Sequence, residues 1–221
     1  MSPFEVFDPS ATLDPARYAG QEGAARLLQA ARHFPGGPVA LVLALFFAPV
    51  GPGVPAGVLL ARHVPLTPAT TFGLYALSDA IAAILCHPLF ALLRRHGRRV
   101  KLIRWLGQRI LSLAMIGVRG PEQTGVAPAL SRIAMVGFGV DVYTAGMLAT
   151  GLPVPRLPGW ASAITGDLLW FAVLLGTSLV AASIADDDRF IALVMIAAMI
   201  VIPRLARRFV PALRPDARRG P

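Results

Sequence analysis

The sequence contains few charged residues and almost no cysteine or lysine. Only 15% of its 221 residues are charged, against about a quarter in soluble domains. Cys86 is the single cysteine, which excludes an internal disulfide framework and a thiolate metal site. No His/Cys metal spacing, phosphate-binding loop or G-x-S-x-G motif occurs. We therefore expect no metal, no cofactor and no enzymatic activity.

Apolar residues dominate the composition. They make up 55% of the chain and gather in several long runs, and the mean hydropathy is +0.63. A helix needs about 20 predominantly apolar residues to span a bilayer, and several of these runs are long enough. The sequence predicts an all-α, multi-pass integral membrane protein.

The stretch Pro38–His63 is apolar but cannot form one straight helix, because each proline removes an amide donor and clashes with the preceding turn. We expect two half-helices, 38–48 and 54–62, that form a re-entrant hairpin, since backbone freed at membrane depth must be buried in protein or line a watery cavity. A kinked spanning helix and a plain loop are the alternatives. The predicted tip residues are Pro49, Gly51, Pro52, Gly53 and Pro55.

A second interrupted segment, Val126–Gly151, has the same character. Its centre contains Gly137, Gly139 and Asp141, which we expect at a second hairpin tip. The broken helices of this kind commonly form the substrate sites of secondary transporters.

The two interrupted segments belong to an internal repeat. AGVL at 56–59 matches AGML at 145–148, and each match is followed by a proline-rich turn. A predicted span then follows in each copy, at 69–93 and at 160–184. Internal repeats are common in secondary transporters. We therefore predict an inverted repeat of a re-entrant hairpin plus a transmembrane helix.

The predicted organisation has three parts, with interfacial amphipathic helices in addition. The last membrane helix is expected to end before Pro203. The parts are a polar, amphipathic segment at 1–37, a membrane domain at 38–203 (repeats at 38–94 and 126–184, last helix at 190–203) and a basic tail at 204–221.

Clustered arginines indicate the orientation. Six basic residues fall in 94–104 and six in 204–219, and positive clusters beside spans stay in the cytoplasm. Both clusters lie inside only if 126–151 enters and leaves on the cytoplasmic side. This predicts an inner-membrane protein with a cytoplasmic C-terminal tail, and by symmetry a first hairpin that enters from the opposite side. The charges near the N-terminus leave its side open.

Two stretches, APVGPGVPAGVLLARHVPL and AGMLATGLPVPRLPGWASAITGDLLWFAVLLG, combine a hairpin tip, an AG-x-L step, a turn and a span. This pattern resembles the DedA/VTT membrane family over roughly residues 40–185. The resemblance implies two inverted re-entrant hairpins and translocation of a lipid or lipid carrier, with proton coupling.

The chain departs from that family at both tips. Gly53-Val54-Pro55 stands where the family has an acidic residue, and Asp141–Thr144 occupies the region of the family's arginine. In the family these residues handle coupling and anionic head groups, so the resemblance fixes neither the substrate nor the coupling ion. The Pro-Gly-Pro hairpin is also similar to small effluxers of the lysine-exporter type.

Three carboxylates inside apolar segments are the main candidate site residues: Asp79, Asp141 and Asp167. A charge at the centre of a span costs about 3 kcal/mol on insertion scales, so such residues usually face a cavity or a partner. We hypothesise that Asp79 and Asp167 flank a central site for substrate or proton coupling. The alternative is that each carboxylate caps a half-helix or binds loop backbone.

Two basic side chains are further candidates. Arg132 lies in an apolar run and is expected to meet an anionic head group or Asp141, with snorkelling to the surface as the alternative. His87 precedes Pro88, and a hydrogen-bonded structural role is expected for it.

The sequence thus predicts a small secondary transporter or lipid translocase that is proton-coupled through intramembrane aspartates. Its expected partners are membrane lipids and a lipid or small-molecule substrate, without nucleic acid, and a homo-oligomer fits because small inverted-repeat proteins often pair. The alternatives are an effluxer of the lysine-exporter type and an intramembrane scaffold that does not transport.

Overall fold

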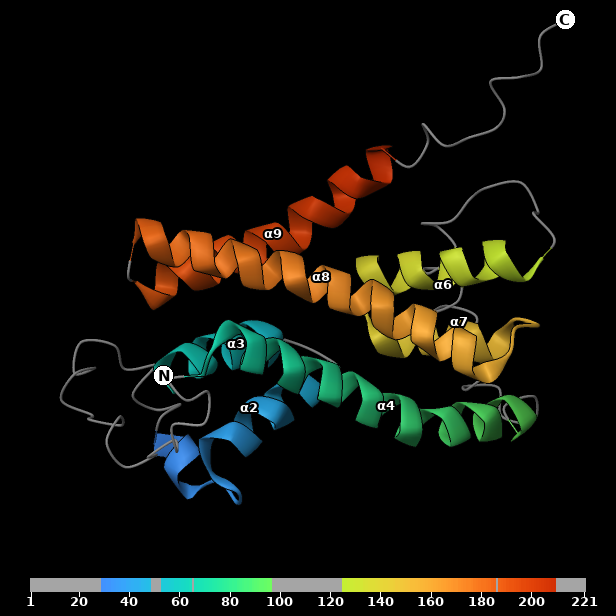
Figure 1. Cartoon of the computed structure of the whole chain (residues 1–221), viewed down its shortest axis with the longest axis horizontal. Helices are drawn as coiled ribbons and strands as arrows, with labels where there is room; N and C mark the ends of the chain where they lie inside the picture. The colour runs from blue at the N-terminus through green and yellow to red at the C-terminus, as the bar shows by residue number, and fades with distance from the viewer. Residues whose placement is uncertain (1–28, 49–52, 65, 97–124, 186, 210–221) are drawn as a thin grey trace, which may run out of the picture.

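The computed structural model describes residues 29–48, 53–64, 66–96, 125–185 and 187–209 (Figure 1). This part of the chain is helical and contains no strand, which confirms the all-α prediction. The elements are α2 (Gly37–Phe47), α3 (Gly53–His63), α4 (Pro68–His96), α6 (Val126–Gly139), α7 (Val142–Gly151), α8 (Arg156–Ile184) and α9 (Asp188–Phe209).

Local sequence explains where several helices begin. Gly36 and Gly37 have φ values of 86° and 75°, which glycine adopts readily, and Pro38 follows in the first turn of α2. Asp141 caps α7 by accepting a hydrogen bond from the Thr144 amide at 2.6 Å. Pro155 precedes α8 with extended backbone.

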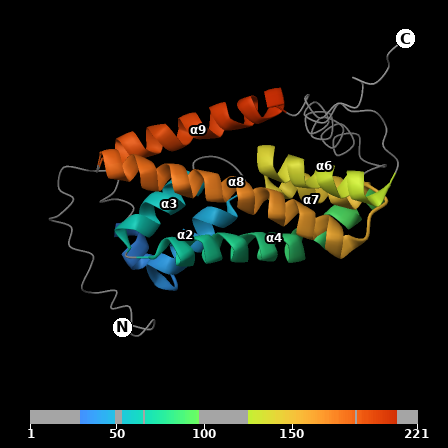
Figure 2. The ribbon, with the colours of Figure 1, turned by 45° about the horizontal axis from the view of Figure 1, so that its top comes forward.

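The helices form two successive units of similar build. Each unit has two short helices followed by a 29-residue helix, which is α4 in the first unit and α8 in the second. The long helices pack against each other and run in opposite directions, with α2 and α3 beside one half of the molecule and α6 and α7 beside the other (Figures 1 and 2). The last helix, α9, packs on α8 and also contacts α3.

Two apolar clusters hold these units together. One joins α2, α3, α4, α8 and α9 around Phe46, Leu60, Phe171 and Met195. The other joins α4, α6, α7 and α8 around Ile133 and Trp160. Helices α6 and α8 approach most closely, because a Cβ atom on Gly166 would overlap the carbonyl oxygen of Ala134.

Several predicted boundaries differ from the structure. The helix α8 begins at Arg156, so the proline-rich turn is shorter than expected. The predicted end of the last helix before Pro203 is wrong, since α9 continues through this proline to Phe209. Pro88 likewise lies inside α4. Proline inside a helix is tolerated where neighbouring groups satisfy the freed backbone.

The predicted tip residues fall mostly beside the breaks. Gly53 and Pro55 lie in the first turn of α3 and are buried, whereas Pro49, Gly51 and Pro52 lie outside the described residues. In the second unit, Gly137 and Gly139 belong to the last turn of α6, and the helix breaks after them, at 140–141. Most of 1–37, the region 97–124 and 210–221 also lie outside the described residues.

Candidate functional site

Asp79 and Asp167 occupy the same position in the two long helices. Counted from Pro68 and from Arg156, each is the twelfth residue of a 29-residue helix. Their side chains lie near enough to interact where α4 packs on α8. The structure therefore brings together the two acids that the sequence places in matching spans.

A tyrosine completes this acid pair. Tyr75 lies one helical turn before Asp79 on α4, so both face α8. The Tyr75 hydroxyl donates a hydrogen bond of 2.9 Å to Asp167 Oδ2. The second carboxylate oxygen of Asp79, Oδ2, is buried and accepts no hydrogen bond from the described residues.

The pair is almost completely removed from solvent. Asp79 is 3% exposed and Asp167 is 2% exposed. Within the described part of the chain, no arginine, lysine or histidine forms an ion pair or a hydrogen bond with either side chain. Two neighbouring negative charges repel strongly in a low-dielectric interior, and this repulsion favours the binding of a proton or another cation by the pair.

The packed helix pairs α2–α3 and α6–α7, called the first and the second hairpin from here on, both reach the acid pair. From the first, Phe46 of α2 packs edge-on against Tyr75 and Phe171, at centroid distances of 5.3 and 5.4 Å, and these two rings stack at 3.8 Å. From the second, a Cβ atom on Gly137 of α6 would lie 3.1 Å from the Asp167 amide nitrogen. Movement of either hairpin therefore changes the surroundings of the carboxylates.

The inner ends of the hairpins also touch each other. The Tyr143 hydroxyl, in the first turn of α7, donates a hydrogen bond of 2.6 Å to the carbonyl oxygen of Phe47, the last residue of α2. Their rings pack edge-on at 6.3 Å. A helix leaves its last carbonyls without internal partners, and here the opposite hairpin supplies one.

The remaining candidates have other positions. Asp141 accepts hydrogen bonds from the amide and the hydroxyl of Thr144, which is the capping role given as its alternative. Arg132 is half-buried on α6, and its expected contact with a head group or with Asp141 stays a prediction. His87 has the expected structural bond, since Nδ1 accepts a hydrogen bond of 3.0 Å from Trp160 Nε1.

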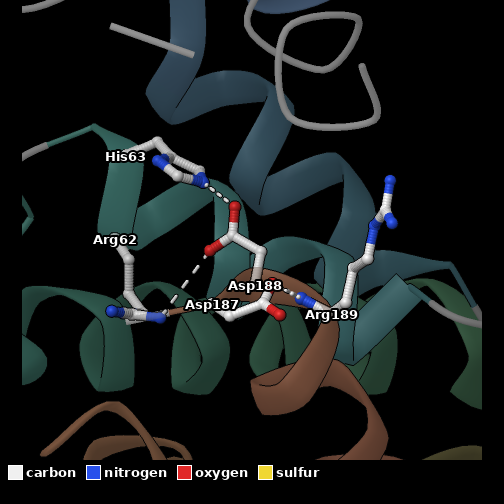
Figure 3. A network of polar contacts seen from close by, with 5 residues as sticks. All are labelled: Arg62, His63, Asp187, Asp188 and Arg189. Carbon is white, nitrogen blue, oxygen red and sulfur yellow. Dashed lines mark hydrogen bonds and ion pairs between the residues drawn. The ribbon is translucent and has the colours of Figure 1, made fainter. Parts of the chain in front are cut away.

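A polar network fastens the base of the first hairpin to α9 (Figure 3). His63 Nε2 lies 2.6 Å from Asp188 Oδ2, and Arg62 Nη1 lies 3.8 Å from Asp188 Oδ1. Asp187 accepts a hydrogen bond of 2.9 Å from the Arg189 amide, while the Arg189 side chain points away from Asp188. The C-terminal end of α3 thus lies beside the N-terminal end of α9.

Sequence reasoning missed Tyr75 and Tyr143. The spacing of Tyr75 and Asp79 is a usable signal, because positions four apart share a helix face. Tyr143 gives no such signal, since its partner is a backbone carbonyl 96 residues away.

Comparison with known proteins found no match: no protein-family model, no curated protein and no solved structure is similar to this chain.

Proposed function

We propose that this protein is a small secondary transporter of the inner membrane that moves a lipid or lipid carrier, with the acid pair Asp79 and Asp167 as its coupling site. The observation that carries the proposal is the convergence of two broken hairpins on one buried pair of carboxylates. Discontinuous helices that meet beside charged groups at mid-membrane are the usual design of transporter binding sites.

Two features support the membrane placement. The helical stretches Pro68–Leu92 and Arg156–Ile184 are long and apolar enough to cross a bilayer. In their most apolar windows only 22% and 33% of residues are buried, whereas the core helix of a soluble protein is mostly buried. Large apolar side chains such as Ile84 (72% exposed) and Val180 (62% exposed) remain on their outer faces. Lipid would cover this surface.

The arrangement of the hairpins supports an inverted repeat. The open ends of the two hairpins lie at opposite ends of the α4–α8 pair (Figures 1 and 2). The C-terminal end of α3 lies beside the turn that joins α8 to α9. If both arginine clusters are cytoplasmic, α8 runs outward and this turn lies on the outer face. The second hairpin then opens to the cytoplasm, like the basic region that follows α4. The family relation to DedA/VTT proteins remains part of this proposal.

The acid pair would carry the coupling ion. Because repulsion within the pair favours proton binding, the pair can bind a proton and release it when a hairpin moves and admits water. Tyr75 donates to Asp167, so Asp167 is the side chain held as the carboxylate and Asp79 is the one that binds the proton. A proton on Asp79 would be shared in the contact between the two carboxyl groups.

Reconstituted vesicles test the proposal. Purified protein is inserted into vesicles that contain a fluorescent phospholipid and a trapped pH-sensitive dye, and both signals are followed after an imposed pH gradient. We expect lipid movement that is accompanied by proton flux. Asp79→Asn and Asp167→Asn should slow both by about tenfold or more, which corresponds to about 1.4 kcal/mol of barrier. Asp187→Asn, which alters an exposed acid outside the hairpins and can still accept from the Arg189 amide, is the matched control and should retain the rate.

Two other outcomes point to the alternatives. Export of an organic cation without lipid movement would favour a small-molecule effluxer. Absence of both fluxes in vesicles would favour a scaffold and contradict the transport proposal.

The topology has its own test. With Cys86 replaced by serine, single cysteines at positions 125 and 153 are labelled by a membrane-impermeant reagent. Both should react from the cytoplasmic side, because α6 and α7 form a hairpin. Labelling from opposite sides would show that 126–151 crosses the membrane and would end the inverted-repeat proposal.

A further inference from the structure

A cavity of about 150 Å³ lies where α7 ends and α8 begins, against the face of α4. Its polar lining consists of His87, Thr150, Arg156 and Trp160, and the other lining residues are apolar. Neither carboxylate of the acid pair lines it. The cavity is therefore a second location, about two helical turns beyond Asp79 along α4.

His87 presents a fixed donor at this cavity. The indole Nε1–H of Trp160 can only donate, so the His87 Nδ1 atom that it contacts at 3.0 Å must be the acceptor. A neutral imidazole with an accepting Nδ1 carries its proton on Nε2. His87 thus offers one N–H group to a ligand.

The surrounding contacts hold Trp160 in place. Its ring lies directly on Gly146, where a Cβ atom would overlap it, and Phe90 stacks on it at 6.3 Å. Trp160 is 7% exposed. The bond to His87 is therefore made by a side chain with little freedom, which reduces the entropy lost on binding.

The charge at the cavity favours an anion. Arg156 is the first residue of α8, and none of the described residues forms an ion pair with it. The first turn of α8 contains no acidic residue, Pro155 provides no side-chain cap, and no acid lines the cavity. The α8 N-terminus adds positive potential, which the carbonyls at the end of α7 partly offset. The charge of Arg156 therefore makes the electrostatic potential at the cavity positive.

We infer that this cavity binds the phosphate group of an amphiphile, with the Arg156 guanidinium and the His87 Nε2–H as its donors. Arginine matches phosphate oxygens in a two-pronged geometry, and the imidazole adds a third donor. Leu157, the next residue, is 84% exposed and provides apolar surface for an acyl chain beside the head group. The site does not depend on transport, and it would hold a lipid even if the acid pair moved nothing.

Binding to the full-length protein in a neutral detergent tests this inference. The probes are dioctanoyl phosphatidic acid, dioctanoyl glycerol as its phosphate-free counterpart, and inorganic phosphate, each titrated by a change in intrinsic tryptophan fluorescence and by thermophoresis. We expect saturable binding of the phosphatidic acid and none of the neutral lipid. Arg156→Gln should weaken binding by about tenfold or more, the loss expected for one charge-assisted contact. His87→Gln should weaken it less, by about threefold to tenfold.

Arg189→Gln is the matched control, because it removes an exposed arginine at the start of another helix, and it should bind like the native protein. Binding of inorganic phosphate as tight as that of the lipid would assign the same site to free phosphate. Equal affinity of Arg156→Gln and the native protein, or an equal loss in Arg189→Gln, would overturn the inference. Both changes lie on the surface, and unchanged thermal unfolding confirms that each variant is folded.

Discussion

The two hairpins are attached to the long helices by different kinds of contact. In the first, Phe46 packs edge-on against Tyr75 of α4 and Phe171 of α8, so the attachment is made by aromatic rings. In the second, Gly137 and Gly166 bring the backbones of α6 and α8 into direct contact. Rings can turn or slide by small amounts, whereas two backbones in contact cannot approach further. We therefore expect the second hairpin to be fixed to α8 and the first to be the one that moves.

The glycines at matching positions of the two AG-x-L repeats show a related difference between the two units. Gly57 lies under the ring of Phe46, from its own hairpin, and Gly146 lies under the ring of Trp160, from the following long helix. Each glycine leaves room for an aromatic ring. Because the ring comes from α8 in the second unit, this contact also ties that hairpin to its long helix.

Filling the space at Gly166 should cause the largest loss of stability. Gly166→Ala places a methyl group on the Ala134 carbonyl, which separates α6 from α8, and we expect a loss of about 3 kcal/mol. Thermal unfolding in detergent measures it. Gly176→Ala is the control in the same helix, because a Cβ atom there meets nothing within 4 Å.

The corresponding change in the first unit sharpens the comparison. Gly57→Ala meets the Phe46 ring rather than backbone, so we expect about 1–2 kcal/mol. A loss as large as that of Gly166→Ala would contradict the distinction between a contact made by a ring and a contact made by backbone.

Removal of the Tyr75 hydroxyl should have an effect of similar size. Tyr75→Phe leaves Asp167 without its donor in a buried position, which costs about 1–3 kcal/mol. A double-mutant cycle with Asp167→Ala, which removes the acceptor, measures the coupling, and the effect of Tyr75→Phe should shrink in that background. Additive losses would show that the bond contributes nothing to stability.

Loss of the hydrogen bond between the hairpin tips should lower the free energy of unfolding by a smaller amount. Tyr143→Phe keeps the ring beside Phe47 but removes the donor to its carbonyl, and we expect about 1 kcal/mol. Spin labels at 44 and 147 should report a broader distance distribution in the variant. An unchanged distribution would mean that other contacts hold the tips together.

Loss of the network at the base of the first hairpin should have the smallest effect. Asp188 is partly exposed, at 18% of its side chain, and exposed pairs contribute about 0–1 kcal/mol. Asp188→Asn should therefore lower stability by less than about 1 kcal/mol and should lose its effect in high salt. Arg189→Gln, whose side chain points away from the network (Figure 3), is the control.

Much of the element order could be predicted from the sequence. Prolines and glycines interrupt the apolar runs, so the predicted helices at 38–48 and 54–62 differ from α2 and α3 by one residue at each end. The end of α9 could not be predicted in this way, because a rule for isolated helices stops the helix at Pro203 and neighbouring elements decide whether it continues.

The candidate site, like the fold, could be predicted from the sequence only in part. An aspartate in each long apolar run was visible in the sequence, because a charge there is costly and conspicuous. The sequence left open whether each acid caps a helix or faces a partner, and only the packing shows that Asp141 caps α7 while Asp79 and Asp167 lie together. The contacts of Tyr143 and Trp160 join residues 96 and 73 positions apart, and no local pattern encodes them.

The sequence by itself determined the helical class, the interrupted segments and the matching aspartates, because these depend on backbone chemistry and on the cost of burying charge along one stretch of chain. The tertiary structure alone decided which acids meet, which tyrosine serves them and where the hairpins touch. Those features depend on how α4 and α8 cross, which is set by the close fit of side chains and backbones from distant parts of the chain.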